Sequence, residues 1–408
     1  MKNRRFALGP HRIGWVLLAA TSFFAGSAVA ALNASQRSMS AVLAATCTPP
    51  PDSNFFAAPA YCGQLPQLTP GSAAYDSIVR QMTPDQILAI GSMGTRTNGG
   101  QTSVIKQVLS DRTRTWRLGA GGAAGDDLTA PLGLWFKLDT DFGGLGRSVE
   151  FSGFRYNNFG LTAGADYRIS DRWIAGLAFN YQRSNARLLD ERGDTNHDSY
   201  TGNIYTSYYI TDSLHLEATG AYSGFDYETF RNVRGPGVAG RMTGKPGAGQ
   251  YAFSAGGGYD FQIDSFLFAP YVRADYLGLD VDGYRESGGP AAMQFEQQHI
   301  RSLTSSVGAL FSKAISLPWG VLTPQLRGEW HHQFMDEGRT IHAAFVSNPA
   351  TTQMTILGSS PDRDFYTLGA DLSGTFAHGI SAFLSYQTLL GSRSIESHKV
   401  MLGTRLEF

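Results

Sequence analysis

The feature that most constrains this chain is an alternation of apolar and polar residues with a period of two, which begins at Leu132 and continues to Phe408. Between Phe159 and Tyr167 every second residue is apolar, and the residues between them are small or polar. The side chains of a β-strand point to alternate faces, so this pattern predicts an antiparallel sheet with one apolar face. Glycine, at 48 of 408 residues, is frequent enough to disfavour a helical bundle, because it weakens helix interiors by about 1 kcal/mol relative to alanine.

Strand length distinguishes a membrane barrel from a soluble sandwich. Most predicted strands are longer than the roughly 5–6 residues usual in globular sheets, and they match the roughly 9–11 or more that a tilted bilayer crossing needs. We therefore predict an all-β fold, a twelve-stranded antiparallel transmembrane β-barrel over 132–408, with an N-terminal helical segment in its lumen. The predicted strands are 132–140, 159–169, 173–184, 199–211, 213–226, 249–263, 266–281, 300–316, 320–335, 364–376, 379–390 and 397–408.

The predicted connections alternate between short turns and long polar loops. This asymmetry is typical of bacterial outer-membrane barrels, whereas Greek-key sandwiches do not show it so regularly. The short turns are 170–172, 212, 264–265, 317–319 and 377–378; the long loops are 141–158, 185–198, 227–248, 282–299 and 336–363, with a shorter one at 391–396. Four tryptophans near strand ends are predicted to belong to aromatic girdles, a buried position being the alternative for any one of them: Trp135, Trp173, Trp319 and Trp330.

Residues 1–30 are predicted to be a secretory signal peptide. A basic stretch precedes a short apolar segment from Ile13 to Phe24, and Ala28-Val29-Ala30 supplies the small residues of a cleavage site. The apolar segment is too short for a comfortable transmembrane helix, and an uncleaved anchor is the alternative. The basic residues are Lys2, Arg4, Arg5 and Arg12.

Residues 31–71 are rich in alanine, proline and serine and show no convincing periodicity. This segment contains the two cysteines of the chain, Cys47 and Cys62. Beyond a secretory signal they lie in an oxidising compartment, so we predict a disulfide that restricts the unfolded chain by about 3 kcal/mol. A metal-binding pair or a reactive thiol is the lesser alternative, because no histidine lies nearby.

Residues 72–131 are predicted to be a helical plug or linker, and 72–117 are the only helix-like part of the chain. Thr83-Pro84-Asp85-Gln86 has the pattern of a helix N-terminus, with threonine as N-cap and proline at the first helical position. A second helix is predicted from Ser103 to Trp116, followed by a connector rich in glycine and alanine. One side of this second helix carries Val104, Ile105, Val108 and Leu109, and the other carries Lys106, Arg112, Arg114 and Arg117.

Four parts of the sequence resemble the translocator domain of type V autotransporters: the helical run Tyr75–Trp116, Gly-Leu-Trp-Phe at 133–136, the block at 160–167 and the last strand. The resemblance implies that the helix lies in the pore and joins the barrel to an N-terminal passenger at the cell surface. It also implies that the last strand is read by the barrel-assembly machinery, through an aromatic end and alternate apolar residues. These assembly-signal residues are Val400, Leu402, Leu406 and Phe408.

The chain departs from that family in its N-terminal region. Only about forty residues separate Ala30 from the helical zone, and they contain no β-helix repeat. We therefore expect no large effector passenger, and instead a plugged barrel or a very short displayed segment. Whether 31–71 is exposed at the surface or periplasmic stays open at this point.

Charged residues in the non-lipid phase of the strands are predicted to face the lumen. An arginine exposed to hydrocarbon would cost about 2–4 kcal/mol at mid-bilayer, whereas a wet lumen can solvate or pair it. The acidic members could hold the basic side of the plug helix, namely Lys106, Arg112 and Arg114; a generic polar lumen without specific partners is the alternative. The predicted lumen charges are Asp166, Arg168, Glu217, Asp260, Arg273, Asp275, Arg327, Glu329, Asp371, Arg405 and Glu407.

Two further motifs are candidate binding sites. Arg192-Gly193-Asp194, in a predicted loop, matches an integrin-binding tripeptide, which arises easily by chance. His331 and His332, with His342, Asp336 and Glu337, suggest a metal site, but adjacent residues of a strand point to opposite faces, so a satisfied rim histidine is favoured.

An enzyme is the rival class of function. His197 and Ser199 share a strand face, as a nucleophile and its base could, but no asparagine follows on the next predicted strand, and no soluble-enzyme motif is present. The net charge of −1 argues against nucleic acid. We predict a non-enzymatic bacterial outer-membrane protein without a cofactor, whose partners are membrane lipid and the assembly machinery and which translocates or displays its own short N-terminal region. The alternative is a small plugged pore or a structural or adhesive surface protein of unknown ligand.

Overall fold

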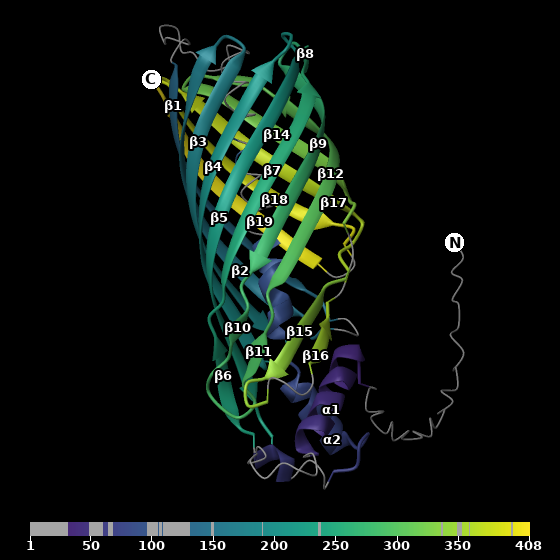
Figure 1. The fold of residues 1–408 in the computed structure, drawn as a ribbon. Coiled ribbons are helices and arrows are strands. Elements are labelled where there is room, and N and C mark those ends of the chain that lie inside the picture. Colours follow the sequence, from purple (N-terminus) through teal and green to yellow (C-terminus); the bar gives the residue numbers. More distant parts are fainter. Residues whose placement is uncertain are drawn as a thin grey trace, which may run out of the picture. The chain divides into compact units, whose positions relative to one another are not determined.

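Twelve long antiparallel strands form a closed barrel, as predicted (Figure 1). Consecutive long strands pair with one another, and the first and last strands pair over nearly their whole length, from Gly133 opposite Glu407 to Leu145 opposite Ile395. Because each strand has a partner on both sides, the barrel has no free edge. The barrel strands are β1 (Leu132–Leu145), β2 (Phe154–Ser170), β3 (Trp173–Leu188), β4 (Gly193–Tyr209), β5 (Leu214–Val233), β7 (Gly247–Tyr259), β9 (Phe266–Val281), β12 (Gln298–Lys313), β14 (Gly320–Gln333), β17 (Asp364–Phe376), β18 (Ile380–Leu390) and β19 (Ile395–Glu407).

The computed structural model describes part of the chain, all of it within the unit Leu32–Phe408. Residues 1–31, with the predicted signal peptide, lie outside the described residues. No helix in the described part is long and apolar enough to cross a bilayer. The described residues are 32–48, 60–63, 68–95, 105, 108, 131–147, 151–189, 191–235, 238–335, 338–348, 353–358, 360–392 and 395–408.

The two faces of the strands differ as the alternation predicts. Leu177 on the outward face is 64% exposed, whereas Gln182, in the opposite phase of the same strand, is buried. An apolar outer surface of this kind suits hydrocarbon. Trp173, Trp319 and Trp330 are exposed on the outside, where an aromatic girdle belongs.

Trp135 does not belong to a girdle. Its side chain is buried in the lumen and donates a hydrogen bond through Nε1 to the hydroxyl of Tyr205, at 2.8 Å. The residue lies in the inward phase of β1, because Leu134 and Phe136 on either side of it are exposed. Proximity to a strand end was therefore a weaker guide to its position than the strand phase.

The turns at one end of the barrel are short, and two of them are extended by the short strands β8 (Phe261–Ile263) and β13 (Ile315–Leu317). Asp264 and His378 in such turns have positive φ angles of 52° and 63°, the left-handed conformation that tight turns use. The start of β1 and the C-terminus lie at this same end (Figure 1). Short turns are periplasmic in outer-membrane barrels, so the opposite end, which carries the long loops, is the outer end.

The long loops contain more structure than the sequence predicted. β2 begins five residues earlier than expected and β5 continues to Val233, because buried residues keep the strand phase beyond the lipid-facing part. A separate four-stranded sheet, in the order β10-β11-β15-β16, also forms from two predicted loops. The additional strands are β6 (Gly240–Gly244), β10 (Tyr284–Arg285), β11 (Met293–Phe295), β15 (Thr340–Phe345) and β16 (Met354–Leu357).

The N-terminal region is helical over more of its length than predicted. α1 (Ala34–Cys47) lies within the segment that showed no periodicity, so the expectation that 72–117 holds the only helix was wrong. A capping box between Asn33 and Gln36 begins α1, and this local signal was available in the sequence. Its apolar residues form only a narrow stripe, so packing against other elements is needed to stabilise it.

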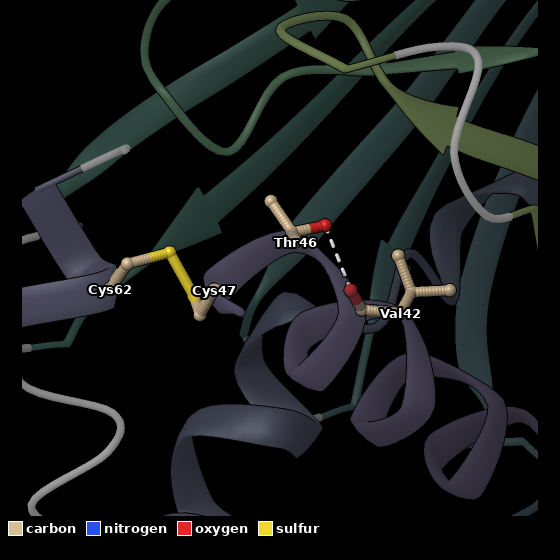
Figure 2. Close-up of a disulfide and its surroundings, with 4 residues drawn as sticks. All are labelled: Val42, Thr46, Cys47 and Cys62. Carbon is tan, nitrogen blue, oxygen red and sulfur yellow. Dashed lines mark hydrogen bonds between the residues drawn. A yellow bond between two sulfur atoms is a disulfide. The ribbon is translucent and has the colours of Figure 1, made fainter. Parts of the chain in front are cut away.

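The predicted disulfide is formed and connects the end of α1 to the short helix η1 (Ala60–Gly63) (Figure 2). α2 (Ala73–Met82) follows, with Ser72 as its N-cap. Thr83, predicted to begin the next helix, instead ends α2 and donates a hydrogen bond back to the Val79 carbonyl at 2.8 Å. The following helical residues are 86–95.

Candidate functional site: the capped outer end and the lumen

The helical segment after α2 enters the barrel from the outer end. Gln250, in the lumen phase of β7, donates a hydrogen bond to the carbonyl of Gly94 at 3.1 Å. Ile105 and Val108, both helical, are buried against Trp135 and Tyr205 near the opposite end. From 86–95 to Ile105 and Val108, the described helical residues thus succeed one another from the outer end toward the periplasmic end, inside the lumen, as predicted for an N-terminal helical segment. Of the predicted helix from Ser103 to Trp116, the described residues are Ile105 and Val108.

This direction places the preceding residues at the outer end of the barrel. We call the described part of 32–95 the cap. The cap shares one hydrophobic core with the outer ends of the strands and with the four-stranded sheet. Core residues of the cap include Met39, Val42, Leu43, Tyr61, Ile78, Val79, Met82, Ile87, Ile90 and Met93, and those of the strands and loops include Phe151, Phe154, Leu188, Tyr227, Val233, Met242, Leu279, Val281, Met293, Phe295, Ile341, Phe345, Met354 and Ile356.

A buried ion pair holds the end of α2. Arg231, at the outer end of β5, is 1% exposed, and its Nη2 lies 2.5 Å from Oε2 of Glu286. The same guanidinium donates to the carbonyls of Met82, at 3.0 Å, and Ala291, at 2.7 Å. Gln86 donates to Glu286 at 3.0 Å. The last carbonyls of a helix have no partner within it and carry partial negative charge. The pair therefore joins α2 electrostatically to β5 and to the connection between β10 and β11.

A second arginine contacts the turn between the two helices. Arg192 donates to the carbonyl of Arg80, and its Nη2 lies 3.1 Å from Oδ2 of Asp85. Ser152, from the loop before β2, donates to the same carboxylate oxygen. Asp85 is buried, so these contacts supply the counter-charge and hydrogen bonds that a buried carboxylate requires.

A third arginine reaches the segment that enters the lumen. Arg339, just before β15, donates through Nη2 to the Leu88 carbonyl at 3.0 Å. Burial lowers the pKa of Arg339 to about 10, which leaves the guanidinium charged at neutral pH. A Cβ added at Gly91 would collide with the Arg339 side chain, so the helix and the loop approach each other closely there. Three arginines, one at the outer end of β5 and two from loops, thus contact consecutive parts of the cap.

One group of predicted lumen charges lies near the periplasmic end. Arg405 is hydrogen-bonded to Asp166, and its Nε donates to Glu407 at 2.9 Å. The Tyr205 hydroxyl donates to Asp166 at 3.3 Å and accepts from Trp135. These contacts join the ion pair to residues that pack against the lumenal helix.

A second group crosses β5, β9 and β14. Arg273 lies 3.4 Å from Glu217 and 3.9 Å from Glu329, which accepts a hydrogen bond from the Tyr271 hydroxyl at 2.7 Å. A neighbouring pair joins Arg327 and Asp371 at 3.7 Å. Asp260 accepts from the Tyr209 hydroxyl at 3.1 Å, and Arg168 and Asp275 are half-buried in the same phase of β2 and β9.

The predicted partners of these charges on the plug helix, Lys106, Arg112 and Arg114, lie outside the described residues. Of the assembly-signal residues, Leu402, Leu406 and Phe408 are exposed, and Val400 is half-buried in the same outward phase.

The integrin-type tripeptide is not presented as a free loop. Arg192 is engaged by the cap, Gly193 begins β4, and Asp194 lies 3.4 Å from Arg187 on the neighbouring strand. A receptor that reads arginine and aspartate together would have to displace both contacts, so the geometry does not favour this reading.

The histidines do not assemble a metal site in the described part of the chain, where no three His, Cys, Asp or Glu side chains converge. His331 points into the lumen, with Nδ1 2.7 Å from the Ser306 hydroxyl and Nε2 3.0 Å from that of Thr367. His332 points outward and lies 2.9 Å from Asp364. His342 is half-buried on β15, and Asp336 and Glu337 lie outside the described residues.

His197 and Ser199 are buried in the same phase of β4, as predicted from their spacing. The imidazole packs against the rings of Phe225 and Tyr227, and the Ser199 hydroxyl donates to the Gln182 carbonyl at 3.5 Å. These contacts belong to the packing of the outer end.

The sequence of the barrel matches a known family. Residues 134–387 match the family described as "Autotransporter beta-domain". The chain belongs to this family. It is therefore an outer-membrane barrel of bacteria, in agreement with the resemblance of its helix, strands and last residues.

Two solved structures share the fold. The translocator domain of the autotransporter NalP from Neisseria meningitidis has a TM-score of 0.60 at 14% identity, and the match covers 79% of this chain and 99% of that domain. The β-domain of the Bordetella autotransporter BrkA has a TM-score of 0.51 at 17% identity, over 68% of this chain and 100% of that domain.

Two curated relatives carry the names of enzymes. Esterase EstA of Pseudomonas aeruginosa is 27% identical over 262 residues, which are 62% of this chain and 39% of EstA. An extracellular serine protease of Serratia marcescens is 24% identical over 281 residues, 67% of this chain and 26% of the protease. The chain thus spans well under half the length of either relative.

Sequence reasoning missed Arg231, Glu286 and Arg339, which lie in or beside predicted loops. The available signal was the apolar content of those loops, such as Met293 and Phe295, since residues that stay in water need not be apolar.

Proposed function

We propose that the barrel translocates its own N-terminal region through the lumen and retains it at the cell surface as a folded cap. The observation that carries this proposal is the buried contact of Arg231 and Glu286 with Met82 and Gln86. Such a contact requires α2 to lie at the outer end, and Ile105 and Val108, which follow α2 in the sequence, are buried in the lumen against Trp135 of β1.

The contacts between the cap and the outer end of the barrel support retention of the cap at the cell surface. The core of the cap is continuous with that of the strands, and three arginines far apart in the sequence bind it. A released passenger would leave these side chains and a large apolar surface in water, which is unfavourable. The alternative of a small plugged pore is not favoured by membership of the autotransporter family.

Three further expectations belong to this proposal. Residues 1–30 direct export, and the last strand, together with the terminal Phe408, is recognised by the assembly machinery through its outward apolar residues. The chain itself acts as a translocator without enzymatic activity. The esterase and protease names of its relatives belong to proteins more than twice as long as the matched part.

The location of the cap can be tested with a protease site placed between the two cysteines, within 49–59, in cells that express the full chain. Protease added to intact cells should cut this site, and the fragments should separate on a gel only after reduction, because the disulfide joins them. The same site at the short turn 264–265 is the control and should be cut only after the outer membrane is permeabilised. Cleavage within 49–59 that also requires permeabilisation would contradict the proposal.

A further inference from the structure

Three arginines project from the outer surface of β2 and β3, toward the outer end of the barrel. Arg155 lies in the outward phase of β2, and Arg183 and Arg187 lie in the outward phase of β3. All three residues are exposed, and the side chains of Arg183 and Arg187 remain 64% and 79% exposed although each lies near a carboxylate. We call these three residues the arginine patch.

The height of the arginine patch in the membrane follows from the geometry of β3. Trp173, at the short-turn end of this strand, belongs to the periplasmic girdle, and Arg183 follows it by ten residues on the same face. At about 3.4 Å per residue and a strand tilt of about 40°, ten residues rise about 26 Å along the membrane normal, which matches an apolar band about 25 Å tall. Tyr181 and Tyr200, whose ring centroids lie 5.4 Å apart, form the aromatic boundary just below Arg183. The patch therefore begins at the outer edge of the hydrocarbon, where lipid head groups lie.

The arginine patch carries more positive charge than its neighbours offset. Arg155 and Arg187 lie directly opposite each other across β2 and β3. The Cβ atoms of such a pair are about 5 Å apart, and like charges placed there repel each other. Asp194 lies 3.4 Å from Arg187 and Asp198 lies 4.0 Å from Arg183, so two carboxylates face three guanidinium groups.

Arg155 is the member of the patch with the least compensation. Its neighbour on the other side, in β1, is Gly144, which has no side chain, and Glu396 lies one strand further round the barrel. Among the residues that the structure describes, no carboxylate lies within ion-pair distance of Arg155. The patch thus has one guanidinium in excess and space for an anion beside it.

We propose that the arginine patch binds the phosphate groups of glycolipids in the outer leaflet of the outer membrane. Guanidinium groups bind phosphate through paired hydrogen bonds, and a phosphate between Arg155 and Arg187 removes their mutual repulsion. The acyl chains of the same lipid pack against the apolar surface below the patch, where Phe159 and Phe179 are 52% and 56% exposed. A phosphate ion from solution lacks this second contact, so the lipid is the favoured ligand. Bound lipid fixes this edge of the barrel at the level of the head groups.

The test uses the full chain, purified in micelles of an uncharged detergent and mixed with lipid A, a phosphorylated glycolipid. Native mass spectrometry measures the fraction of the protein that retains the lipid. The unaltered chain should bind lipid A at least about tenfold more tightly than the same lipid without its phosphates, because hydrogen bonds between charged groups are stronger than those between neutral groups. Arg155→Gln combined with Arg187→Gln should abolish this preference. Lys245→Gln combined with Arg285→Gln is the matched control, since it removes two exposed cations elsewhere at the outer end and should leave the preference unchanged.

Three results would overturn the proposal. Equal affinity of the unaltered chain for the two lipids would show that phosphate is not recognised. A preference that persists in the arginine double variant would place the phosphate site elsewhere. Release of lipid A by inorganic phosphate at the same concentration would show that the ligand is the free anion and not the lipid.

Heat-modifiable migration on gels verifies that each variant has assembled. Should the double variant assemble poorly, Arg155→Gln alone should still lower the preference about threefold, since this arginine supplies part of the phosphate contact; an unchanged preference would remove Arg155 from the site. Protease access to 49–59 on intact cells reports the location of the cap separately, because lipid binding depends on the outer face of the barrel and not on the cap.

Discussion

Substitution of Arg231 by methionine should release the cap from the outer end while the barrel stays folded. The change leaves Glu286 buried without its counter-charge and removes donors from two carbonyls, at Met82 and Ala291. Loss of one partner of a buried ion pair typically costs about 3–5 kcal/mol. At about 1.4 kcal/mol for each factor of ten, the equilibrium for undocking of the cap should rise by roughly 10²- to 10⁴-fold. The barrel should persist because its ladder of hydrogen bonds is closed without the cap.

Amide hydrogen exchange measures this equilibrium directly. The amides of residues 86–95 should exchange faster by the same factor in purified protein, while those in the middle of the barrel strands stay slow. Arg234→Met is the matched control, because Arg234 lies three residues further on and its side chain is exposed. Glu286→Gln combined with Arg231→Met leaves no unpaired charge, so the loss in the double variant should be smaller than the sum of the two single losses.

The reasoning would be refuted if residues 86–95 exchanged equally slowly in Arg231→Met and in the unaltered chain. The buried ion pair of Arg231 would then contribute nothing measurable to the docking of the cap. Equal acceleration in Arg234→Met would point instead to a general effect of removing a surface charge. Heat-modifiable migration on gels verifies in every variant that the barrel has assembled.

Three further predictions concern the barrel. Leu177→Arg should reduce assembly several-fold more than Gln182→Arg, because only Leu177 faces hydrocarbon, where an arginine costs about 2–4 kcal/mol; equal amounts of folded protein in the membrane would show that the strand phase is wrong. Deletion of Phe408 should impair assembly, measured as a loss of the heat-modifiable form, and an undiminished yield would remove its role as an assembly signal. Deletion of residues 31–117 should leave a folded barrel with higher conductance in planar bilayers, because the lumen loses its helix; equal conductance, with an open lumen in the structure of the truncated barrel, would contradict that role for the helix.

Local pattern was sufficient to predict the barrel. Whether a strand residue such as Leu177 faces lipid depends on its phase along its own strand. The alternation of apolar and polar residues around it in the sequence shows that phase. The number of crossings follows from the same alternation together with the turns. The disulfide was also predictable, since Cys47 and Cys62 are the two cysteines of an exported chain. The rule that a tryptophan near a strand end belongs to an aromatic girdle is less reliable. It fails for Trp135, which is buried in the lumen because it lies in the inward phase of its strand.

The cap could not be predicted in the same way. α1 has few apolar residues and only a capping box to indicate it, so its stability depends on what it packs against. The strands of the small sheet are short, β10 having two residues and β11 three. Their partners come from loops far apart in the sequence. A strand of two or three residues is too short to show the alternation of apolar and polar residues that predicts a longer strand.

The sequence by itself determined the barrel, its membrane and its family, because a lipid-facing sheet imposes a repeating requirement on every strand. Only the tertiary structure decided that the N-terminal region lies at the outer end and is held there. That outcome rests on single long-range contacts, such as Arg231 with Glu286 and Met82, which lie 55 and 149 residues apart in the sequence. An arginine in a predicted loop has the same appearance in the sequence whether it is solvated or buried in an ion pair, and the difference arises only when distant segments fold together.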